Sequence, residues 1–217
     1  MSQTRTIVHL LRHGEVENPG GVLYGRLPEY HLSERGQAMA LRVADHLKNA
    51  DLVHLRCSPL ERAQETMAPH AEIHGLPVTT DGRVIEADNF LEGQVVSVGM
   101  SAFRNPANWR YFTNPTRPSW GEPYREIVAR MRLAIKDAAA EAAGHEALIV
   151  SHQLPIWMAR CDVEGRRLFH DPRRRECTLA SLTSLTLIDG RVTSVNYIEP
   201  AADLLPRAVS TKPAAGA

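Results

Sequence analysis

The stretch Thr6-Ile-Val-His-Leu-Leu11, followed at once by Arg12-His13-Gly14, decides the fold that we expect for this chain. Its β-branched and leucine residues stop abruptly at polar ones, which is typical of a buried strand that delivers polar side chains at its C-terminal end. Leu52–Cys57 and Glu146–Ser151 repeat the pattern, and a serine and a histidine follow them. The sequence therefore predicts three buried strands that each end at candidate functional residues.

Helical patterns fill the sequence between these strands. Ser33 is suited to cap a helix with apolar residues at 40, 41, 44 and 47, and Ser58-Pro59 opens a second helix that reaches about His74. Apolar positions from 127 to 142 trace one face of a third helix, and a fourth begins at 153–155.

Asp189-Gly190, between two β-rich runs at 182–188 and 192–198, predicts a hairpin, because this dipeptide suits the positive dihedrals of a tight turn. Strands that alternate with helices indicate an α/β fold, a three-layer α/β/α sandwich with a mostly parallel central sheet and helices on both faces. Ligands of such sheets lie beyond the carboxyl ends of the strands, which directs attention to Arg12-His13, Ser58 and His152.

The length of 217 residues favours one catalytic domain, which we assign to residues 1–199. Residues 94–124 fit no strand or helix pattern and carry aromatic residues, prolines and arginines at 104, 110 and 117, so we expect a lid inserted over the site. Residues 200–217 have little large apolar surface and are expected to form a flexible C-terminal tail.

Charge and cysteine content restrict the partners. The 25 Lys and Arg balance 25 Asp and Glu, so neither nucleic acid nor a membrane surface is an expected partner. Three widely spaced cysteines indicate neither a disulfide framework nor a zinc site, and we expect a cytoplasmic protein. The basic cluster Arg166–Arg175 is interrupted by acidic residues and predicts a loop, at a subunit contact or near the substrate entrance. His70 and His74 predict a surface helix end rather than a metal site.

His13 is the strongest single candidate for chemistry. The permanently charged Arg12 beside it disfavours a second positive charge, which should lower the pKa of His13 and keep a neutral, nucleophilic nitrogen available. Gly14 would let a ligand approach the backbone closely. A structural histidine at a strand end has the same appearance, so other residues must decide between the two interpretations.

Three motifs occur in order and each follows a predicted strand: Leu11-Arg12-His13-Gly14-Glu15 with Asn18, Ser58-Pro59-Leu60-Glu61-Arg62-Ala63-Gln64-Glu65-Thr66, and Val150-Ser151-His152. Together they resemble the histidine phosphatase superfamily, in its phosphoglycerate mutase-like branch. The resemblance implies a metal-independent phosphomonoesterase that has no cofactor, acts on a small phosphorylated metabolite and forms a homodimer. His13 would form a phosphohistidine, while Arg12, Arg62 and His152 would surround the phosphate.

The same resemblance implies a carboxylic acid that protonates the leaving group and later activates water. The family places this acid after a short strand near the middle of the chain, and Glu86 after Val84-Ile85 is our choice. The surrounding residues are one shorter than the family's pattern and lack its glycine, so Asp88 and Glu92 are rivals. Asn18, Arg26 and Gln153 are the further substrate-binding candidates; at Gln153 and Leu154 the family often has glycines.

Two other functions compete with hydrolysis. A cofactor-dependent phosphoglycerate mutase shares the first half-reaction, but the Trp-Asn pair that it would show after the first motif is replaced by Glu15-Val16-Glu17-Asn18. A regulatory module that binds a phosphorylated ligand without turnover is the second alternative. The complete set of Arg12, His13, Arg62 and His152 argues against such a module.

Overall fold

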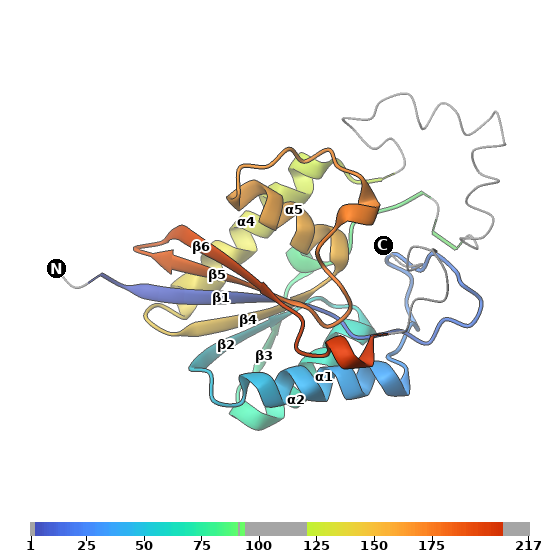
Figure 1. Ribbon diagram of the computed structural model, residues 1–217, viewed down its shortest axis with the longest axis horizontal. Coiled ribbons are helices and arrows are strands. Elements are labelled where there is room, and N and C mark those ends of the chain that lie inside the picture. The colour runs from blue at the N-terminus through green and yellow to red at the C-terminus, as the bar shows by residue number, and fades with distance from the viewer. Residues whose placement is uncertain (1–2, 91, 94–120, 206–217) are drawn as a thin grey trace.

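The computed structural model describes residues 3–90, 92–93 and 121–205, and within them a twisted sheet forms the centre of the chain (Figure 1). The strand order is β3-β2-β4-β1-β5-β6. The strands are β1 (Arg5–Arg12), β2 (Leu52–Cys57), β3 (Val78–Thr80), β4 (Glu146–Ser151), β5 (Leu182–Ile188) and β6 (Arg191–Ile198). The three predicted buried strands are confirmed as β1, β2 and β4.

The middle of the sheet is parallel and one edge is antiparallel. β4 pairs in parallel with both β1 and β2, and β2 pairs in parallel with β3. β5 and β6 form the predicted hairpin and join β1 in antiparallel fashion, with positive φ angles of 48° at Asp189 and 77° at Gly190 in the turn. In the β1–β4 register Arg12 lies opposite Ser151, so both strands end at the same edge.

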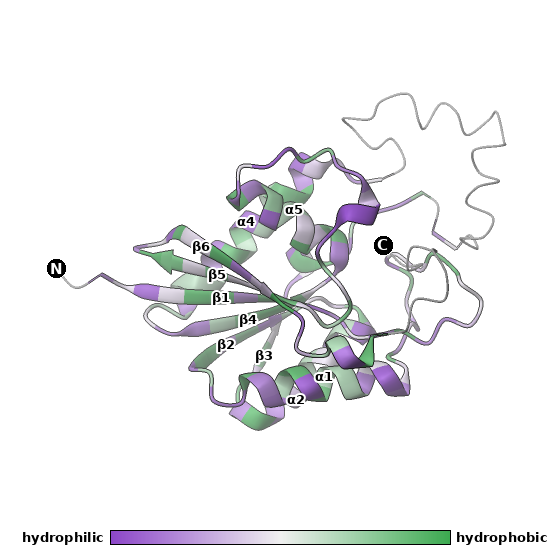
Figure 2. Ribbon diagram, viewed as in Figure 1, coloured by the Kyte–Doolittle hydropathy of each residue, from purple (hydrophilic) through white to green (hydrophobic). Residues whose placement is uncertain are grey.

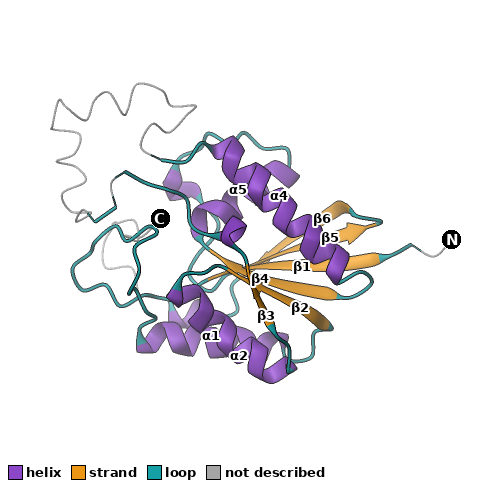
Figure 3. Cartoon of the chain, turned by 180° about the vertical axis from the view of Figure 1, so that it is seen from behind, coloured by secondary structure: helices purple, strands orange, loops and turns teal. Residues whose placement is uncertain are grey.

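Helices cover both faces of the sheet, as a three-layer sandwich requires (Figures 1 and 3). The helices α1 (Glu34–Leu47) and α2 (Glu61–His74) lie on one face, and α4 (Tyr124–Glu141) and α5 (Gln153–Val163) lie on the other. A hydrophobic core lies on each face of the sheet, between the strands and the helices. Successive residues of a strand point into opposite cores, because side chains alternate along a strand. Leu10 packs in the core under α4 and α5, and Leu11 packs in the core under α1 and α2. Figure 2 shows apolar stretches within the strands between these layers.

Two helix ends show how local chemistry sets the boundaries. The Ser33 hydroxyl accepts a hydrogen bond from the Gly36 N–H at 3.0 Å, which confirms the predicted cap of α1. The helix α2 begins at Glu61 rather than at Ser58, because the backbone of Leu60 is still extended and the Ser58 hydroxyl bonds elsewhere. The prediction that this helix opens at Ser58-Pro59 was therefore wrong by about three residues.

Two further expectations need correction. Val84 ends a short 3₁₀ turn (Gly82–Val84) and Ile85 follows in extended backbone, so neither belongs to a strand before Glu86. His70 is fully buried in α2 rather than exposed at a surface helix end, and burial lowers its pKa to about 4. Neither ring nitrogen of His70 has a hydrogen-bond partner among the described residues.

The predicted insertion and tail lie partly outside the described residues. Residues 94–120 and 206–217 are outside them. The segment that enters the insertion is joined to the one that leaves it by a β-bridge between Asn89 and Gly121 and by the Glu122 N–H, which donates to the Asp88 carbonyl at 3.0 Å. Residues 200–205, which the sequence assigns to a tail, pack against the core under α1 and α2, where Ala201 is buried. Among the described helices, none is long and apolar enough to cross a bilayer.

Candidate active site

The carboxyl ends of β1, β2 and β4 bring the three sequence motifs together. The His13 N–H donates to the Ser151 carbonyl at 3.2 Å, and the Ser58 N–H donates to the Val150 carbonyl at 3.0 Å. These backbone bonds extend the parallel ladders by one residue, so the segment after each strand is held in register with its neighbour. The side chains of Arg12, His13 and His152 are at most 3% exposed.

His13 is held as a neutral imidazole. Its Nδ1–H donates to the carbonyl of Gly14 at 2.8 Å, which leaves the lone pair on Nε2. Burial, and then the charges of Arg62 and Arg12, lower the pKa of His13 well below the ordinary value of 6.5. The expected pKa shift is confirmed, although burial contributes more to it than the neighbouring arginine that suggested it.

Two buried arginines beside His13 have unpaired N–H groups. Arg12 donates one hydrogen bond, from Nη1 to the Cys177 carbonyl at 2.7 Å, and Arg62 donates from Nη2 to the Gly25 carbonyl. The Arg62 guanidinium also lies 4.7 Å above the centre of the Tyr24 ring. Arg12 Nε, Arg62 Nε and Arg62 Nη1 are buried and have no hydrogen-bond partner among the described residues.

The His152 ring lies next to the His13 ring and follows the neighbouring strand β4. The two imidazole rings lie 5.1 Å apart, and burial followed by the charges of His13 and Arg62 lowers the pKa of His152 well below 6.5. Its Nε2 is 2.7 Å from the Ser58 hydroxyl, and its buried Nδ1 has no partner within the described chain. If the serine O–H donates to Nε2, the remaining Nδ1–H is a donor available to a ligand.

Gly14 is required for helix packing. A Cβ atom on Gly14 would lie 2.5 Å from the carbonyl oxygen of Gly36, near the start of α1. The Gly14 N–H donates to the Thr66 hydroxyl of α2 at 3.1 Å, and that hydroxyl donates to the Arg62 carbonyl at 2.7 Å. We expected the missing side chain of Gly14 to let a ligand approach the backbone. The segment that approaches Gly14 closely in the structure is the start of α1.

Glu86 is the carboxyl group that lies with this cluster. It is 3% exposed; Oε1 accepts a hydrogen bond from the Ala87 N–H at 2.8 Å, and the buried Oε2 has no partner among the described residues. Burial raises the pKa of Glu86, against the opposing effects of the hydrogen bond from the Ala87 N–H and then of the charges of Arg62, Arg12 and Arg175.

The two rival carboxyl groups are placed differently. Asp88 is exposed, and Oε1 of Glu92 accepts the backbone N–H of Arg26 at 2.9 Å. A buried carboxyl group with a raised pKa is suited to acid catalysis, so the geometry favours Glu86 over both.

Arg26 holds the backbone of Glu86 in place. Its Nε–H donates to the Glu86 carbonyl at 2.7 Å, and its Nη2 pairs with Glu122 at 3.0 Å. Arg130 of α4 pairs with the same Glu122 and donates to the Ile85 carbonyl at 2.7 Å. No motif identified Glu122 or Arg130, because their contacts with the segment at 85–86 exist only in the folded chain.

Asn18 and Gln153, the remaining predicted substrate-binding residues, form hydrogen bonds with neighbouring parts of the protein. Both polar groups of the Asn18 amide bond to the backbone of Val22, at 2.8 and 3.0 Å, so Asn18 closes its own loop. Gln153 donates to the Cys177 carbonyl at 3.3 Å and accepts from Arg175 Nη1 at 3.1 Å. The structure thus adds Arg175, which the sequence showed only as a member of a basic cluster.

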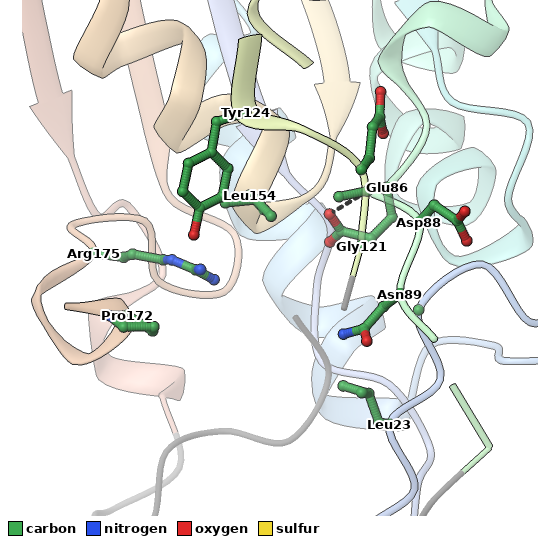
Figure 4. A pocket seen from close by; sticks show the side chains of 12 residues that line it. Leu23, Glu86, Asp88, Asn89, Gly121, Tyr124, Leu154, Pro172 and Arg175 are labelled. Atoms are coloured by element: carbon green, nitrogen blue, oxygen red, sulfur yellow. Dashed lines mark hydrogen bonds between the residues drawn. The ribbon is translucent and has the colours of Figure 1, made fainter. Parts of the chain in front are cut away.

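A pocket of about 120 Å³ opens beside Glu86. Arg175 and Tyr124 lie on one wall, and Glu86 and Asn89 lie on the opposite wall (Figure 4). Leu23, Leu154 and Pro172 supply apolar lining. Glu86 therefore lines this pocket, and it is also close enough to Arg62 and Arg12 of the cluster for their charges to act on its carboxyl group.

The structure brings together Arg12, His13, Arg62 and His152, the set on which the histidine phosphatase resemblance depends. The family model of the histidine phosphatase superfamily (branch 1) matches residues 8–199, and the chain belongs to this superfamily. It is 54% identical over 197 residues to the uncharacterized protein Rv0525 of Mycobacterium tuberculosis, across 91% of this chain and 98% of that protein.

Two further similarities concern proteins named as phosphatases. Phosphoserine phosphatase 1 of Hydrogenobacter thermophilus is 27% identical over 190 residues, which cover 78% of this chain and 89% of that protein. The structure of mycobacterial glucosyl-3-phosphoglycerate phosphatase Rv2419c matches with a TM-score of 0.72 at 23% identity, covering 89% of this chain and 97% of that chain. The structural match confirms the predicted fold class.

Proposed function

We propose that this protein is a phosphomonoesterase that hydrolyses a small phosphorylated metabolite through a phosphohistidine at His13. One observation carries the proposal: unpaired, buried nitrogen atoms of Arg12, Arg62 and His152 surround a neutral imidazole. A buried donor without a partner costs about 1–3 kcal/mol, and more when the group is charged. A phosphoryl group would satisfy these donors at once.

The charges fit phosphoryl transfer. The transferred group carries its negative charge on three equatorial oxygens, and its transfer depends mainly on positioning and electrostatic stabilisation. Two guanidinium groups and the Nδ1–H of His152 supply donors for these oxygens, and charge-assisted bonds of this type are stronger than neutral ones. The proposal assigns this role to protein cations and includes no metal ion.

The proposed reaction has two steps. The lone pair on Nε2 of His13 attacks phosphorus, the P–O ester bond breaks, and the carboxyl proton of Glu86 passes to the leaving oxygen. The Glu86 carboxylate then takes a proton from water, the resulting hydroxide attacks phosphorus, and the P–N bond breaks. Inorganic phosphate leaves, and His13 and Glu86 return to their starting protonation states.

The pKa shifts suit the first step. Lowering the pKa of His13 keeps its lone pair free, and raising the pKa of Glu86 keeps its proton available. The similarity to a phosphoserine phosphatase supports hydrolysis as the outcome. A phosphoglycerate mutase would share the first step but return the phosphoryl group to a sugar acid.

The test is phosphate release from a panel of phosphomonoesters in EDTA, with wild type, His13→Ala and His46→Ala. His46 is an exposed histidine of α1 and is the matched control. Wild type and His46→Ala should release phosphate, and mass spectrometry after rapid acid-free quenching should find phosphate on His13. Faster interconversion of phosphoglycerates than hydrolysis would instead identify a mutase. Binding without release or phosphohistidine would contradict an enzymatic role.

A further inference from the structure

The arginines that are not exposed mostly pair with carboxylates. Arg26 and Arg130 share Glu122, and Arg56 pairs with Asp81. Arg83 and Arg160 likewise form ion pairs with acidic side chains. Within the described part of the chain, the arginines that are at least partly buried and form no such pair are Arg12, Arg62 and Arg175. In the proposed function Arg12 and Arg62 bind the phosphoryl group, whereas Arg175 has no assigned anionic partner.

Arg175 is held in place by neutral acceptors. Its Nε–H donates to His170 Nε2 at 2.9 Å, and its Nη1 donates to Gln153 Oε1 at 3.1 Å. Tyr124 lies beside Arg175 on the same wall of the pocket (Figure 4). His170 accepts at Nε2 because its Nδ1–H donates to the Leu168 carbonyl at 2.7 Å. These contacts fix the direction of the guanidinium without neutralising its charge.

Arg175 lines the same pocket as Glu86, the proposed general acid. The electrostatic environment of Glu86 contains Arg62, Arg12 and Arg175. If Glu86 protonates the leaving oxygen, that oxygen lies at its carboxyl group, with phosphate on the side of Arg12 and Arg62. The rest of the substrate must then extend into the pocket that Glu86 lines, where Arg175 is the basic residue of the lining (Figure 4). The acidic Asp88 lies away from Arg175 in that pocket.

We infer that Arg175 is a specificity-determining residue that binds a second anionic group of the substrate, a carboxylate or another phosphate, on the leaving-group side of the ester. The inference rests on the proposed function for the placement of the ester. A planar guanidinium fork matches either anion. A substrate without a second anion would leave a partly buried cation uncompensated.

Binding without turnover tests this inference. In a His13→Ala background, calorimetry compares 3-phosphoglycerate with glycerol 3-phosphate, which has a hydroxymethyl group in place of the carboxylate. Propane-1,3-diol bisphosphate tests the second phosphate. At least one of the two ligands that carry a second anionic group should bind about 10-fold or more tightly than glycerol 3-phosphate, as expected for hydrogen bonds to a charged group. Adding Arg175→Met should abolish the preference, whereas the exposed neighbour Arg174→Met should keep it.

The ratio of two affinities is insensitive to a general loss of folded protein, and Arg175→Gln replaces Arg175→Met if that variant does not fold. Equal binding of all three ligands, failure of all three to bind, or a preference that survives the loss of Arg175 would overturn the inference. Phosphate release by the wild-type enzyme is measured separately. If the wild-type enzyme hydrolyses phosphomonoesters but the ligand preference is absent, the inference about Arg175 fails and the proposed function stands. If the preference is present but no phosphate is released, the proposed hydrolysis fails.

Discussion

Replacing Glu86 with glutamine should slow the hydrolysis of alkyl phosphates much more than that of aryl phosphates with good leaving groups. An alkoxide needs a proton as it departs, while a nitrophenolate does not. Glutamine retains an oxygen for the Ala87 N–H that Glu86 Oε1 accepts at 2.8 Å, so the local backbone should be preserved. The substitution then removes the proton donor and little else.

The structure favours the lower part of the usual range of effects. General acids contribute about 10²–10⁴-fold to rate. Burial raises the pKa of Glu86, but Arg62 and Arg12 oppose the shift and favour the ionised form. We therefore expect about a 100-fold decrease in kcat/KM for an alkyl ester, equivalent to about 2.7 kcal/mol of transition-state stabilisation. The decrease for p-nitrophenyl phosphate should be below about 10-fold, because its departure needs no acid.

The pH profile provides a second readout. Formation of the phosphohistidine needs a protonated Glu86, so kcat/KM for an alkyl ester should fall as pH rises through the raised pKa of that group. It should also fall at low pH, where His13 binds a proton, although the lowered pKa of His13 moves that limb to more acid conditions. Glu86→Gln should remove the alkaline limb and keep the acid limb.

Asp88→Asn and Glu92→Gln are the controls, because each removes a rival carboxylate at constant size. Both should keep the wild-type ratio of alkyl to aryl activity. Equal losses on both ester types in Glu86→Gln would refute the general-acid role of Glu86. A selective loss in Asp88→Asn or Glu92→Gln would transfer the role to that residue.

Three other substitutions test the surrounding structure. The pKa of buried His70 is about 4 in the folded protein and 6.5 in the unfolded chain, so the unfolding free energy falls as the pH drops below 6.5. We expect this decrease to be about 2 kcal/mol smaller in His70→Leu than in wild type between pH 7 and pH 5. Urea unfolding at the two pH values measures it. Ser58→Ala should lower kcat/KM up to about 10-fold by releasing His152 Nε2, and unchanged kinetics would exclude the proposed tautomer. Gly14→Ala should lower the unfolding free energy by about 1–3 kcal/mol through its clash with Gly36, whereas an unchanged Tm would contradict that packing.

The sequence predicted the centre of the site because the relevant signals are local. The strands β1 and β4 end within their motifs and β2 ends immediately before its motif, and parallel pairing aligns those ends. His13 and His152 could therefore be expected together without knowing any side-chain geometry. The structure places them with ring centres 5.1 Å apart.

Other features depend on contacts between distant segments and left no local signal. The helix α2 begins at Glu61 after an extended Leu60, and the Ser58 hydroxyl bonds to His152, which is 94 residues away. Arg130 lies in a regular amphipathic helix, and its spacing does not reveal that it donates to carbonyls of residues 83 and 85. Arg175 stood among four other arginines of similar appearance, and its burial by His170, Gln153 and Tyr124 distinguishes it.

The bridge between Asn89 and Gly121 has a consequence for how members of this superfamily could diversify. The bridge and the Glu122–Asp88 hydrogen bond anchor both ends of the long insertion next to Glu86, while Arg26 and Arg130 hold the acid itself. Once two ends are fixed, doubling the length between them costs only about 0.6 kcal/mol. Evolution could therefore lengthen, shorten or rewrite the sequence between these two ends while Glu86, the proposed proton donor, keeps its place.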